Sequence, residues 1–304
     1  MLGPVRGLRI KAIAIMTVLT VVFGFAERLT RASESLLFAD PVVYARQTRF
    51  QRIVLTSGRG AFHLFLDGNL QFSSADEYRY HEALVHPVSS AVARHEHVLI
   101  LGGGDGLAAR EVLRYADVKT VTMVDIDPGM TELAAGHPVF VELNGRSMSD
   151  SRMRVVNDDA MAWLAEGDQR YDVVIVDFPD PNNFTLGKLY TTRFYRLLTE
   201  RVAMDGAIVV QATSPLIARQ SYWCVVRTLE ASGLRTLPYH AFVPSFGEWG
   251  YVIGSRAGVE VPQRVLPGLR YLDDSNVGAL FRFAPDMARI ETEVNRLNNQ
   301  VLVR

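Results

Sequence analysis

Cysteine is nearly absent from this sequence. Cys224 is the only one, which excludes a disulfide within the chain and a cysteine-ligated metal site, and we expect it to be a buried packing residue. An excess of charge of one sign is also missing, because 32 Lys and Arg balance 33 Asp and Glu to a formal net charge of −1. Binding to nucleic-acid phosphates needs a basic surface, so no nucleic-acid partner is expected. The sequence contains no internal repeat and no low-complexity tract.

Long apolar runs are confined to the N-terminus. Residues 8–26 are mostly apolar, and the only charges among them, Arg9 and Lys11, lie near the start, where they can reach the membrane interface. This length is close to the ~20 residues that span a bilayer. A secretory signal peptide is the alternative, with a small-x-small cleavage site at Gly24-Phe25-Ala26. We favour a membrane helix followed by an amphipathic connector over residues 1–38.

Beyond residue 38 the apolar pattern changes twice. Short alternating segments rich in β-branched and aromatic residues, with a turn at Asp67-Gly68, predict a small antiparallel β unit over residues 39–76. From residue 77 predicted strands and helices alternate. Strands are predicted at 97–101, 120–124, 154–156, 173–176, 207–211 and 251–253, and helices at 77–86, 107–115, 128–135, 160–165, 189–202 and 217–232. The alternation predicts a doubly wound, mostly parallel α/β sheet over residues 77–258. Residues 259–304 would form a C-terminal extension.

Acidic residues follow three of the predicted strands. Asp125, Asp158 and Asp177 each stand where an apolar run ends. In open parallel sheets the ligand crevice lies at the carboxyl ends of the strands. Three separate segments therefore place carboxylates at one rim of the predicted sheet.

A glycine-rich loop, Gly102-Gly103-Gly104-Asp105-Gly106, follows the first of these parallel strands. Glycines permit a tight turn and a close approach of the backbone to a ligand, although a packing turn would use them too. Asp105 is the informative residue, because a carboxylate would repel a diphosphate but suits an amine or a sulfonium. The loop therefore argues against a dinucleotide and favours a cationic nucleoside.

The next two acidic positions fit a nucleoside. A carboxylate such as Asp125, at the end of the second strand, typically accepts both ribose hydroxyl hydrogens, and a helix cap is the alternative. Asp127 already suits that cap. Asp158 and Asp159 could each bind an adenine amino group or cap the helix that starts near residue 160. The sequence leaves these two alternatives open.

Asp177-Phe178-Pro179-Asp180-Pro181 holds two carboxylates three residues apart after a buried strand. An ammonium, with an ordinary pKa near 10.4, must lose a proton before it can act as a nucleophile. A carboxylate within hydrogen-bond reach can orient the ammonium and accept that proton. An aspartate–proline turn is the structural alternative.

Taken in order, several motifs resemble the spermidine synthases, over residues 51–253. They are Leu66-Asp67-Gly68-Asn69-Leu70-Gln71, Asp76-Glu77-Tyr78-Arg79-Tyr80-His81-Glu82, the glycine loop, the Asp177–Pro181 segment, Leu189-Tyr190 and Phe194-Tyr195. The N-terminal apolar segment and Pro244-Ser245-Phe246-Gly247-Glu248-Trp249-Gly250 resemble the membrane-bound branch of that family. The resemblance implies a class I methyltransferase-like Rossmann fold preceded by the small β unit.

The resemblance also implies a role for each matching residue. Asp177 matches the catalytic base, and Asp180 and Tyr80 match residues that position the acceptor amine. Asp105 matches the aspartate beside the aminopropyl ammonium, and Gln211 the late-strand glutamine of the substrate site. The donor-side matches are Gln51, Gln71, His81, Gly102, Gly104, Asp125, Asp158 and Asp159. Our predicted substrate-binding set is therefore Tyr80, His81, Asp105, Asp180 and Gln211, and Asp177 is the predicted catalytic residue. The residues predicted to bind the donor nucleoside are Gln51, Gln71, Gly102, Gly104, Asp125, Asp158 and Asp159.

Three departures from the family pattern all touch the acceptor side. Phe178 and Pro179 stand where small polar residues are usual, no acidic residue follows Gln211, and Phe246 replaces a frequent tyrosine. Putrescine is the usual acceptor in this family, but these departures leave the identity of the acceptor amine undetermined by the sequence. The seven histidines show no metal-ligand spacing, so no metal site is expected.

The sequence as a whole predicts a polyamine aminopropyltransferase. It would use decarboxylated S-adenosylmethionine as co-substrate, release methylthioadenosine, and keep no permanently bound cofactor. The expected partners are a small amine, the lipid bilayer and a second copy of the chain, in a dimer or tetramer. The donor is cytosolic, so a secreted catalytic domain would have no access to it. We therefore expect a membrane helix and not a cleaved signal peptide, which places the protein at the cell membrane with its catalytic domain on the cytoplasmic side. A methyltransferase and an inactive polyamine-binding protein are the alternatives.

Overall fold

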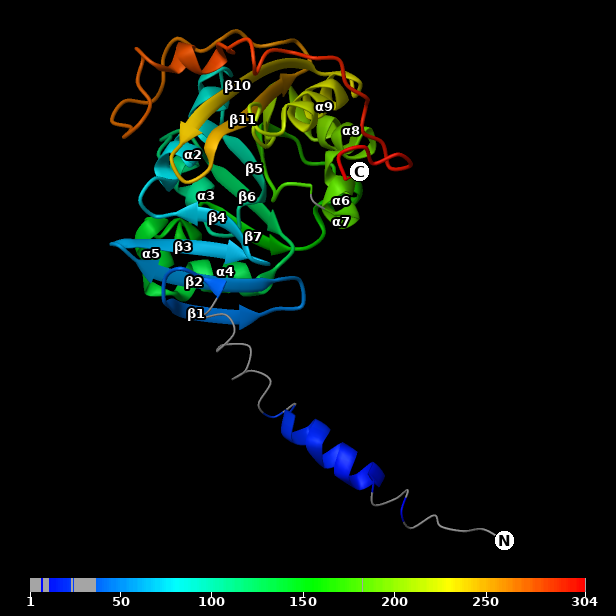
Figure 1. Ribbon diagram of the computed structural model, residues 1–304. Helices are drawn as coiled ribbons and strands as arrows, with labels where there is room; N and C mark the ends of the chain where they lie inside the picture. Colours follow the sequence, from blue (N-terminus) through cyan, green and yellow to red (C-terminus); the bar gives the residue numbers. More distant parts are fainter. Residues whose placement is uncertain (1–6, 8–10, 23, 25–36, 182, 304) are drawn as a thin grey trace. The chain divides into compact units, whose positions relative to one another are not determined.

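The computed structural model describes residues 7, 11–22, 24, 37–181 and 183–303 (Figure 1). Contacts divide the chain into two compact units. One unit joins Met1–Gln47 with Arg52–Gln71, and the other joins Thr48–Gln51 with Phe72–Arg304. All candidate site residues except Gln71 fall in the second unit.

The first unit contains a sheet of order β1-β2-β3-β4. Its strands are β1 Val42–Gln47, β2 Arg52–Gly58, β3 Ala61–Leu66 and β4 Asn69–Ser73. Asp67 and Gly68, between β3 and β4, both have positive φ, 49° and 80°. Two central residues of positive φ define the tight turn that suits the twist of a hairpin. The predicted antiparallel β unit is confirmed, and β1 is a strand that the sequence did not predict.

Residues 11–22 of the first unit are helical, and their apolar side chains are exposed, with Ile13 65% and Met16 66% accessible. Within the described residues, we find no helix that is both long and apolar enough to cross a bilayer. The predicted membrane helix over residues 8–26, the Gly24-Phe25-Ala26 cleavage site and the connector before residue 37 lie partly outside the described residues.

The second unit is built on a seven-stranded sheet of order β10-β11-β9-β8-β5-β6-β7. Its strands are β5 His97–Gly102, β6 Thr120–Asp125, β7 Met153–Asn157, β8 Tyr171–Asp177, β9 Val202–Gln211, β10 Arg235–Val243 and β11 Gly247–Ser255. β5 to β9 pair in parallel, and β11 and β10 form an antiparallel hairpin at one edge. The predicted mostly parallel sheet is confirmed. β10 was missed because Pro238 interrupts its pattern, which an edge strand tolerates.

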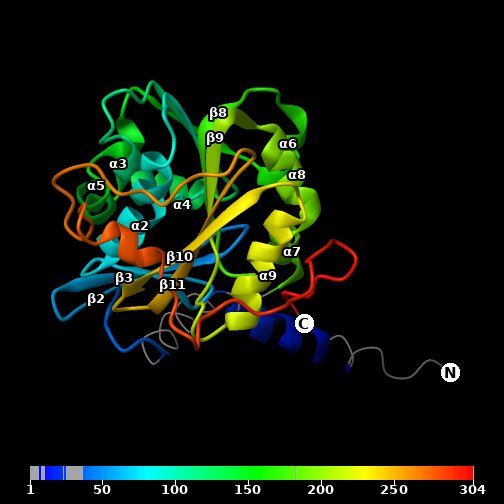
Figure 2. The same ribbon diagram turned by 90° about the horizontal axis from the view of Figure 1, so that it is seen from above.

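Helices cover both faces of this sheet (Figure 2). They are α2 Glu77–Ser90, α3 Leu107–Val112, α4 Pro128–Gly136, α5 Pro138–Leu143, α6 Ala160–Glu166, α7 Phe184–Gly187, α8 Thr192–Glu200 and α9 Arg219–Glu230, with 3₁₀ turns η1 Ser147–Ser149, η2 Lys188–Tyr190 and η3 Val277–Phe281. Alternate strand residues enter opposite cores, since side chains of a strand alternate between its faces. Val98 and Ile100 of β5 join α2 and α3 in one core, whereas Leu99 and Leu101 join α8 and α9 in the other.

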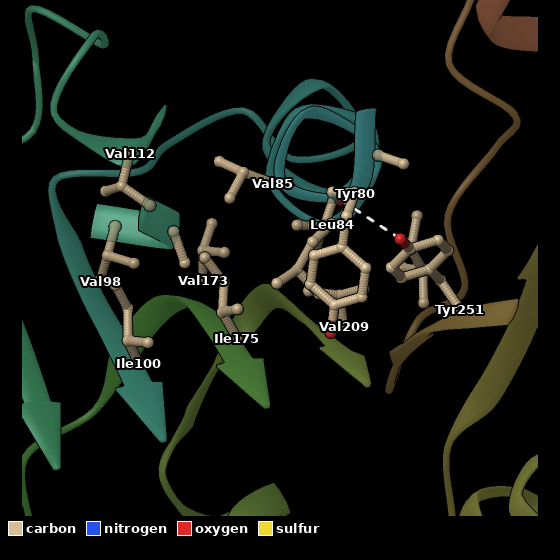
Figure 3. Close-up of a cluster of buried hydrophobic side chains, with 14 of the residues drawn as sticks. Tyr80, Leu84, Val85, Val98, Ile100, Val112, Val173, Ile175, Val209 and Tyr251 are labelled. Atoms are coloured by element: carbon tan, nitrogen blue, oxygen red, sulfur yellow. Dashed lines mark hydrogen bonds between the residues drawn. The ribbon is translucent and has the colours of Figure 1, made fainter. Parts of the chain in front are cut away.

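Figure 3 shows the first core, where Tyr80, Leu84 and Val85 of α2 lie over Ile100, Ile175 and Val209 of the central strands. The Tyr251 hydroxyl donates to the Tyr80 carbonyl oxygen at 3.2 Å. This bond and the packing fix α2 across the sheet and so fix the side chains that α2 carries to the rim.

Three of the predicted helices differ from the structure by three residues or more, and β9 and β11 start five and four residues before the predicted strands. The helix predicted at 189–202 is replaced by η2, by α8, and by the start of β9 at Val202. The helix that was expected to end near residue 86 continues past Pro87 to Ser90, because buried residues such as Val88 add packing that outweighs the missing backbone donor. α3 ends at Val112, earlier than the predicted residue 115.

Candidate active site

The glycine loop after β5 is pressed against the ends of both neighbouring strands. Gly102 and Gly103 have φ of 79° and 64°, which favours glycine. A Cβ on Gly102 would overlap the carbonyl oxygen of Asp177, and one on Gly104 would lie 2.6 Å from Oδ2 of Asp125. A larger residue at Gly102 would therefore displace the end of β8, and one at Gly104 would displace the Asp125 side chain. The tight packing turn is observed, and the close approach of this loop to a ligand stays a prediction.

Asp125, the last residue of β6, is held by backbone donors. Its Oδ2 accepts from the Gly104 amide at 3.1 Å and its Oδ1 from the Asp127 amide at 2.8 Å. Burial, with smaller contributions from neighbouring carboxylates, raises its pKa to about 6. Asp127 caps α4 by accepting from the Gly129 amide, so Asp125 does not serve as that cap.

Asp159 takes the capping role that the sequence left open between two residues. Its carboxylate accepts from the Met161 and Ala162 amides at the start of α6 and pairs with Lys188 Nζ at 2.6 Å. Although its partial burial works in the opposite direction, the bond to Lys188 lowers its pKa. Asp158 is exposed, and its own amide donates to the Asp125 carbonyl oxygen at 3.2 Å.

Asp177, the last residue of β8, is bonded to α2. The Tyr80 hydroxyl donates to its Oδ1 at 2.6 Å. Burial and the charge of Asp105 raise the pKa of Asp177 to about 6, against the opposing effects of His81 and Tyr80. A carboxyl with this pKa is ionised at neutral pH and still basic enough to accept a proton.

Asp105 and His81 lie close enough to influence this carboxyl. Burial raises the pKa of Asp105, whose Oδ1 also accepts from the Leu107 amide at 2.9 Å. His81 Nδ1 contacts the carbonyl oxygen and the carboxylate of Glu77, at 2.8 and 2.9 Å. Burial alone would lower the pKa of His81, but the carboxylates of Glu77, Asp105 and Asp177 raise it. Glu77 is a further charged neighbour of the site, and its position one helical turn before His81 is the sequence signal for this contact.

Gln211, the last residue of β9, is almost fully engaged with protein groups. Its Nε2 donates to the Phe178 carbonyl oxygen, to Tyr190 Oη at 3.1 Å and to Asp180 Oδ1 at 3.3 Å. Its Oε1 accepts from Trp249 Nε1 at 3.1 Å and from the Thr213 amide at 3.3 Å. The predicted substrate contact of Gln211 stays a prediction, and its observed contacts hold the Asp177–Asp180 segment.

Tyr190, Trp249 and Thr213 are site neighbours that our residue predictions omitted. Tyr190 is fully buried, and its hydroxyl contacts the Pro179 carbonyl oxygen at 3.1 Å. Thr213 has φ of 56°, a rare conformation for a β-branched residue. Burial raises the pKa of Asp180, while bonds from Thr213 and Gln211 oppose the rise. Tyr190 and Trp249 stand in motifs that resemble the family, and Thr213 follows Gln211 by two residues, which were the available sequence signals.

The two glutamines predicted for the donor side belong to different units and have different partners. Gln51 Nε2 donates to Asp127 Oδ2 at 2.9 Å, beside the end of β6. Gln71 Nε2 contacts the Asn69 carbonyl oxygen at 3.2 Å within the first unit. Among the described residues, no group of three or more His, Cys, Asp and Glu is arranged to hold a metal ion.

The second unit therefore gathers half-buried carboxylates at or just after the ends of β5, β6 and β8. Asp105 and Asp177 lie within electrostatic reach of each other, and a tyrosine hydroxyl orients the second. Such a rim can hold a positively charged group and accept a proton from it.

The model of the spermine/spermidine synthase domain matches residues 77–262. A polyamine aminopropyltransferase of Leptospira interrogans is 45% identical over 98% of this chain and 60% of its own length, and polyamine aminopropyltransferase 2 of Ralstonia nicotianae is 51% identical over 93% and 56%. The chain thus spans less than two thirds of these relatives.

Among solved structures, a spermidine synthase in complex with the transition state analogue AdoDATO has a TM-score of 0.74 and 25% identity, covering 80% of this chain and 85% of the other. The spermidine synthase of Thermotoga maritima has a TM-score of 0.73 and 24% identity, which supports the fold alone. The motifs, the sheet order and these matches agree, and the chain belongs to the spermine/spermidine synthase family.

Proposed function

We propose that this chain transfers the aminopropyl group of decarboxylated S-adenosylmethionine to putrescine or a related amine and releases methylthioadenosine. The observation that carries the proposal is the half-buried pair of Asp177 and Asp105 beside the ends of β8 and β5, with Tyr80 bonded to Asp177. Family membership and the names of the relatives support it. Neither a resident cofactor nor a metal is required, because the sulfonium is itself a good leaving group.

The reaction needs one displacement and one proton transfer. The amine nitrogen attacks the carbon bonded to the sulfonium, a C–N bond forms, and the C–S electron pair stays on sulfur as a neutral thioether. Asp177 accepts the proton that the ammonium must lose, and Tyr80 holds that carboxylate in place. Holding both substrates in line supplies most of the remaining acceleration.

The two substrates divide the rim between them. We assign the amine to Tyr80, Asp177 and Asp180, with Gln211 supporting Asp180. The aminopropyl ammonium of the donor is assigned to Asp105, and His81 is a further polar residue of the donor side. The other donor contacts that we propose are Gln51, Gln71, Gly102, Gly104, Asp125, Asp158 and Asp159. The hydrogen bond that the Gly104 amide donates to the Asp125 carboxylate supports the nucleoside end of this assignment.

Replacing the base tests the proposal directly. We expect Asp177→Asn to lower the rate of aminopropyl transfer by about 10²–10⁴-fold, the typical contribution of a general base, while calorimetry shows unchanged donor affinity. Glu142→Ala, an exposed substitution away from the strand ends, is the matched control. Mass spectrometry of products from a panel of amines identifies the acceptor.

The same assays discriminate the other functions that this fold could carry. Full activity of Asp177→Asn refutes the assignment of the base. Preferential binding of ordinary S-adenosylmethionine, with methylated products, would identify a methyltransferase. Binding of amines without any product would identify a polyamine-binding protein.

We also propose that the N-terminal segment attaches the protein to the cell membrane, with the catalytic domain on the cytoplasmic side. The exposed apolar side chains of residues 13–22 support this, because apolar surface of this extent favours lipid over water. We further propose that the protein forms a homodimer or a tetramer. The proposed domain boundaries follow residues 38, 76 and 258.

A further inference from the structure

Asn295 lies beyond the region that the family model matches, and it is completely buried. Its Nδ2 donates to the Tyr190 carbonyl oxygen at 2.9 Å and to the Gly187 carbonyl oxygen at 3.4 Å. Its carbonyl oxygen accepts from the Thr192 amide at 3.1 Å. One side chain and one peptide group of the C-terminal segment thus hold three points of the short segment 187–192.

Asn295 is itself fixed to α9. The backbone amide of Asn295 donates to Thr228 Oγ1 at 2.9 Å, and Thr228 Oγ1 in turn donates to the Cys224 carbonyl oxygen at 2.7 Å. Both threonine and asparagine are fully buried. Since α9 packs on the sheet, Asn295 links segment 187–192 to a rigid part of the fold.

Segment 187–192 contacts both halves of the proposed site. On the acceptor side, Tyr190 Oη contacts the carbonyl oxygens of Phe178 and Pro179 and accepts from Gln211. Phe178 and Pro179 are the two residues between Asp177 and Asp180. On the donor side, Lys188 pairs with Asp159 at the start of α6. A displacement of this segment would therefore be transmitted to the groups around Asp177.

We propose that Asn295 is a positioning residue for the transfer reaction, through Tyr190 and the Phe178–Pro179 carbonyls. The expected effect on kcat rests on the proposed function, whereas the contacts by which Asn295 holds segment 187–192 do not depend on it. Asn295 contacts no predicted substrate-binding residue, so its effect passes through another side chain.

The test compares Asn295→Ala with Asn299→Ala in the full chain. Asn299 stands in the same segment, is only partly buried, and its side chain bonds the Val294 carbonyl oxygen and the Arg296 amide of that segment. Well below the melting temperature of both variants, we expect Asn295→Ala to lower kcat about 10-fold or more, since small misplacements of reacting groups have large kinetic effects. We expect the kcat of Asn299→Ala to match that of the unsubstituted chain.

Two further readouts separate positioning from general destabilisation. Hydrogen exchange should rise in peptides from residues 184–200 of Asn295→Ala but not in β5 or β6. The double variant Asn295→Ala/Tyr190→Phe should lose less kcat than the product of the fold-losses of the two single variants. Such non-additivity is expected because both substitutions interrupt the same series of contacts. In an active chain, unchanged kcat of Asn295→Ala would overturn the positioning role, and unchanged exchange would overturn the anchoring of segment 187–192.

Exchange also keeps the two proposals separable. If the unsubstituted chain forms no product with any amine, the proposed function fails, and faster exchange over residues 184–200 still supports the anchoring role. If the chain is active and Asn295→Ala retains its kcat, only the positioning role fails.

Discussion

Asp177 and Asp159 carry the same side chain, but their neighbours give them opposite properties. Burial and a nearby carboxylate raise the pKa of Asp177 to about 6, whereas an ion pair with Lys188 lowers that of Asp159. The first remains able to accept a proton near neutral pH, and the second is committed to capping a helix. The place of each aspartate, at the end of a strand or at the start of a helix, therefore decides whether its carboxylate can act as the proposed base or caps the helix.

The raised pKa of Asp177 predicts the acid limb of the pH profile. The base must be ionised, so kcat/KM for the amine should fall as pH falls below about 6, by about tenfold per pH unit. A pH series at saturating donor measures this.

Tyr80→Phe supplies the control for that assignment. The Tyr80 hydroxyl favours the ionised form of Asp177, so its removal should move the acid limb to higher pH. An acid limb at the ordinary carboxyl pKa near 3.9, or one that Tyr80→Phe leaves in place, would contradict the role of Asp177.

At the scale of elements, α2 connects the candidate site to residues 270–272. Three consecutive residues of α2 serve different partners: Tyr80 bonds Asp177, His81 bonds Glu77, and Glu82 accepts from the amides of Arg270, Tyr271 and Leu272 at 2.8 to 3.0 Å. Successive residues of a helix point about 100° apart, so one turn can reach all three. α2 is therefore a scaffold as well as a source of site residues.

Removing the Glu82 carboxylate should destabilise the fold. Glu82 is 1% exposed, and Glu82→Ala would leave three backbone donors of the C-terminal segment without this acceptor. We expect a loss of about 2–4 kcal/mol in the free energy of unfolding, measured by urea denaturation.

The control is an exposed glutamate on a short helix. Glu142→Ala in α5 should change the free energy of unfolding by no more than about 0.5 kcal/mol. Equal denaturation midpoints for the two variants would show that the Glu82 bonds contribute little.

At the scale of the whole molecule, the proposed membrane attachment has a direct test. In flotation with phospholipid vesicles, the full chain should rise with the lipid, because residues 13–22 expose apolar side chains. Val18→Asp combined with Leu19→Asp should abolish flotation, since a charged group in the bilayer is costly.

A second pair of substitutions controls for charge. Met204→Asp combined with Phe242→Asp places two charges on exposed apolar positions of the second unit and should leave flotation unchanged. If the unsubstituted chain stays in the aqueous fraction, the attachment proposal is wrong for this chain.

Local pattern was sufficient for the parallel sheet and for the residues at its rim. Apolar runs ending in Asp125 and Asp177, the glycine loop and the Asp67-Gly68 turn each depend on backbone geometry within a few residues. The sequence by itself therefore determined the type of fold, the family motifs and the order of the acidic groups along the chain.

Only tertiary structure decided which polar groups are already satisfied. Gln211, Asp159 and His81 are ligand-binding candidates in the sequence, and each is bonded to a partner far along the chain or one helical turn away. Tyr190, Trp249 and Asn295 enter the network only because folding brings the end of β8, β11 and the C-terminal segment together. Hydrogen bonds between distant residues leave no periodic trace in the sequence, which is why the support of the site had to come from the structure.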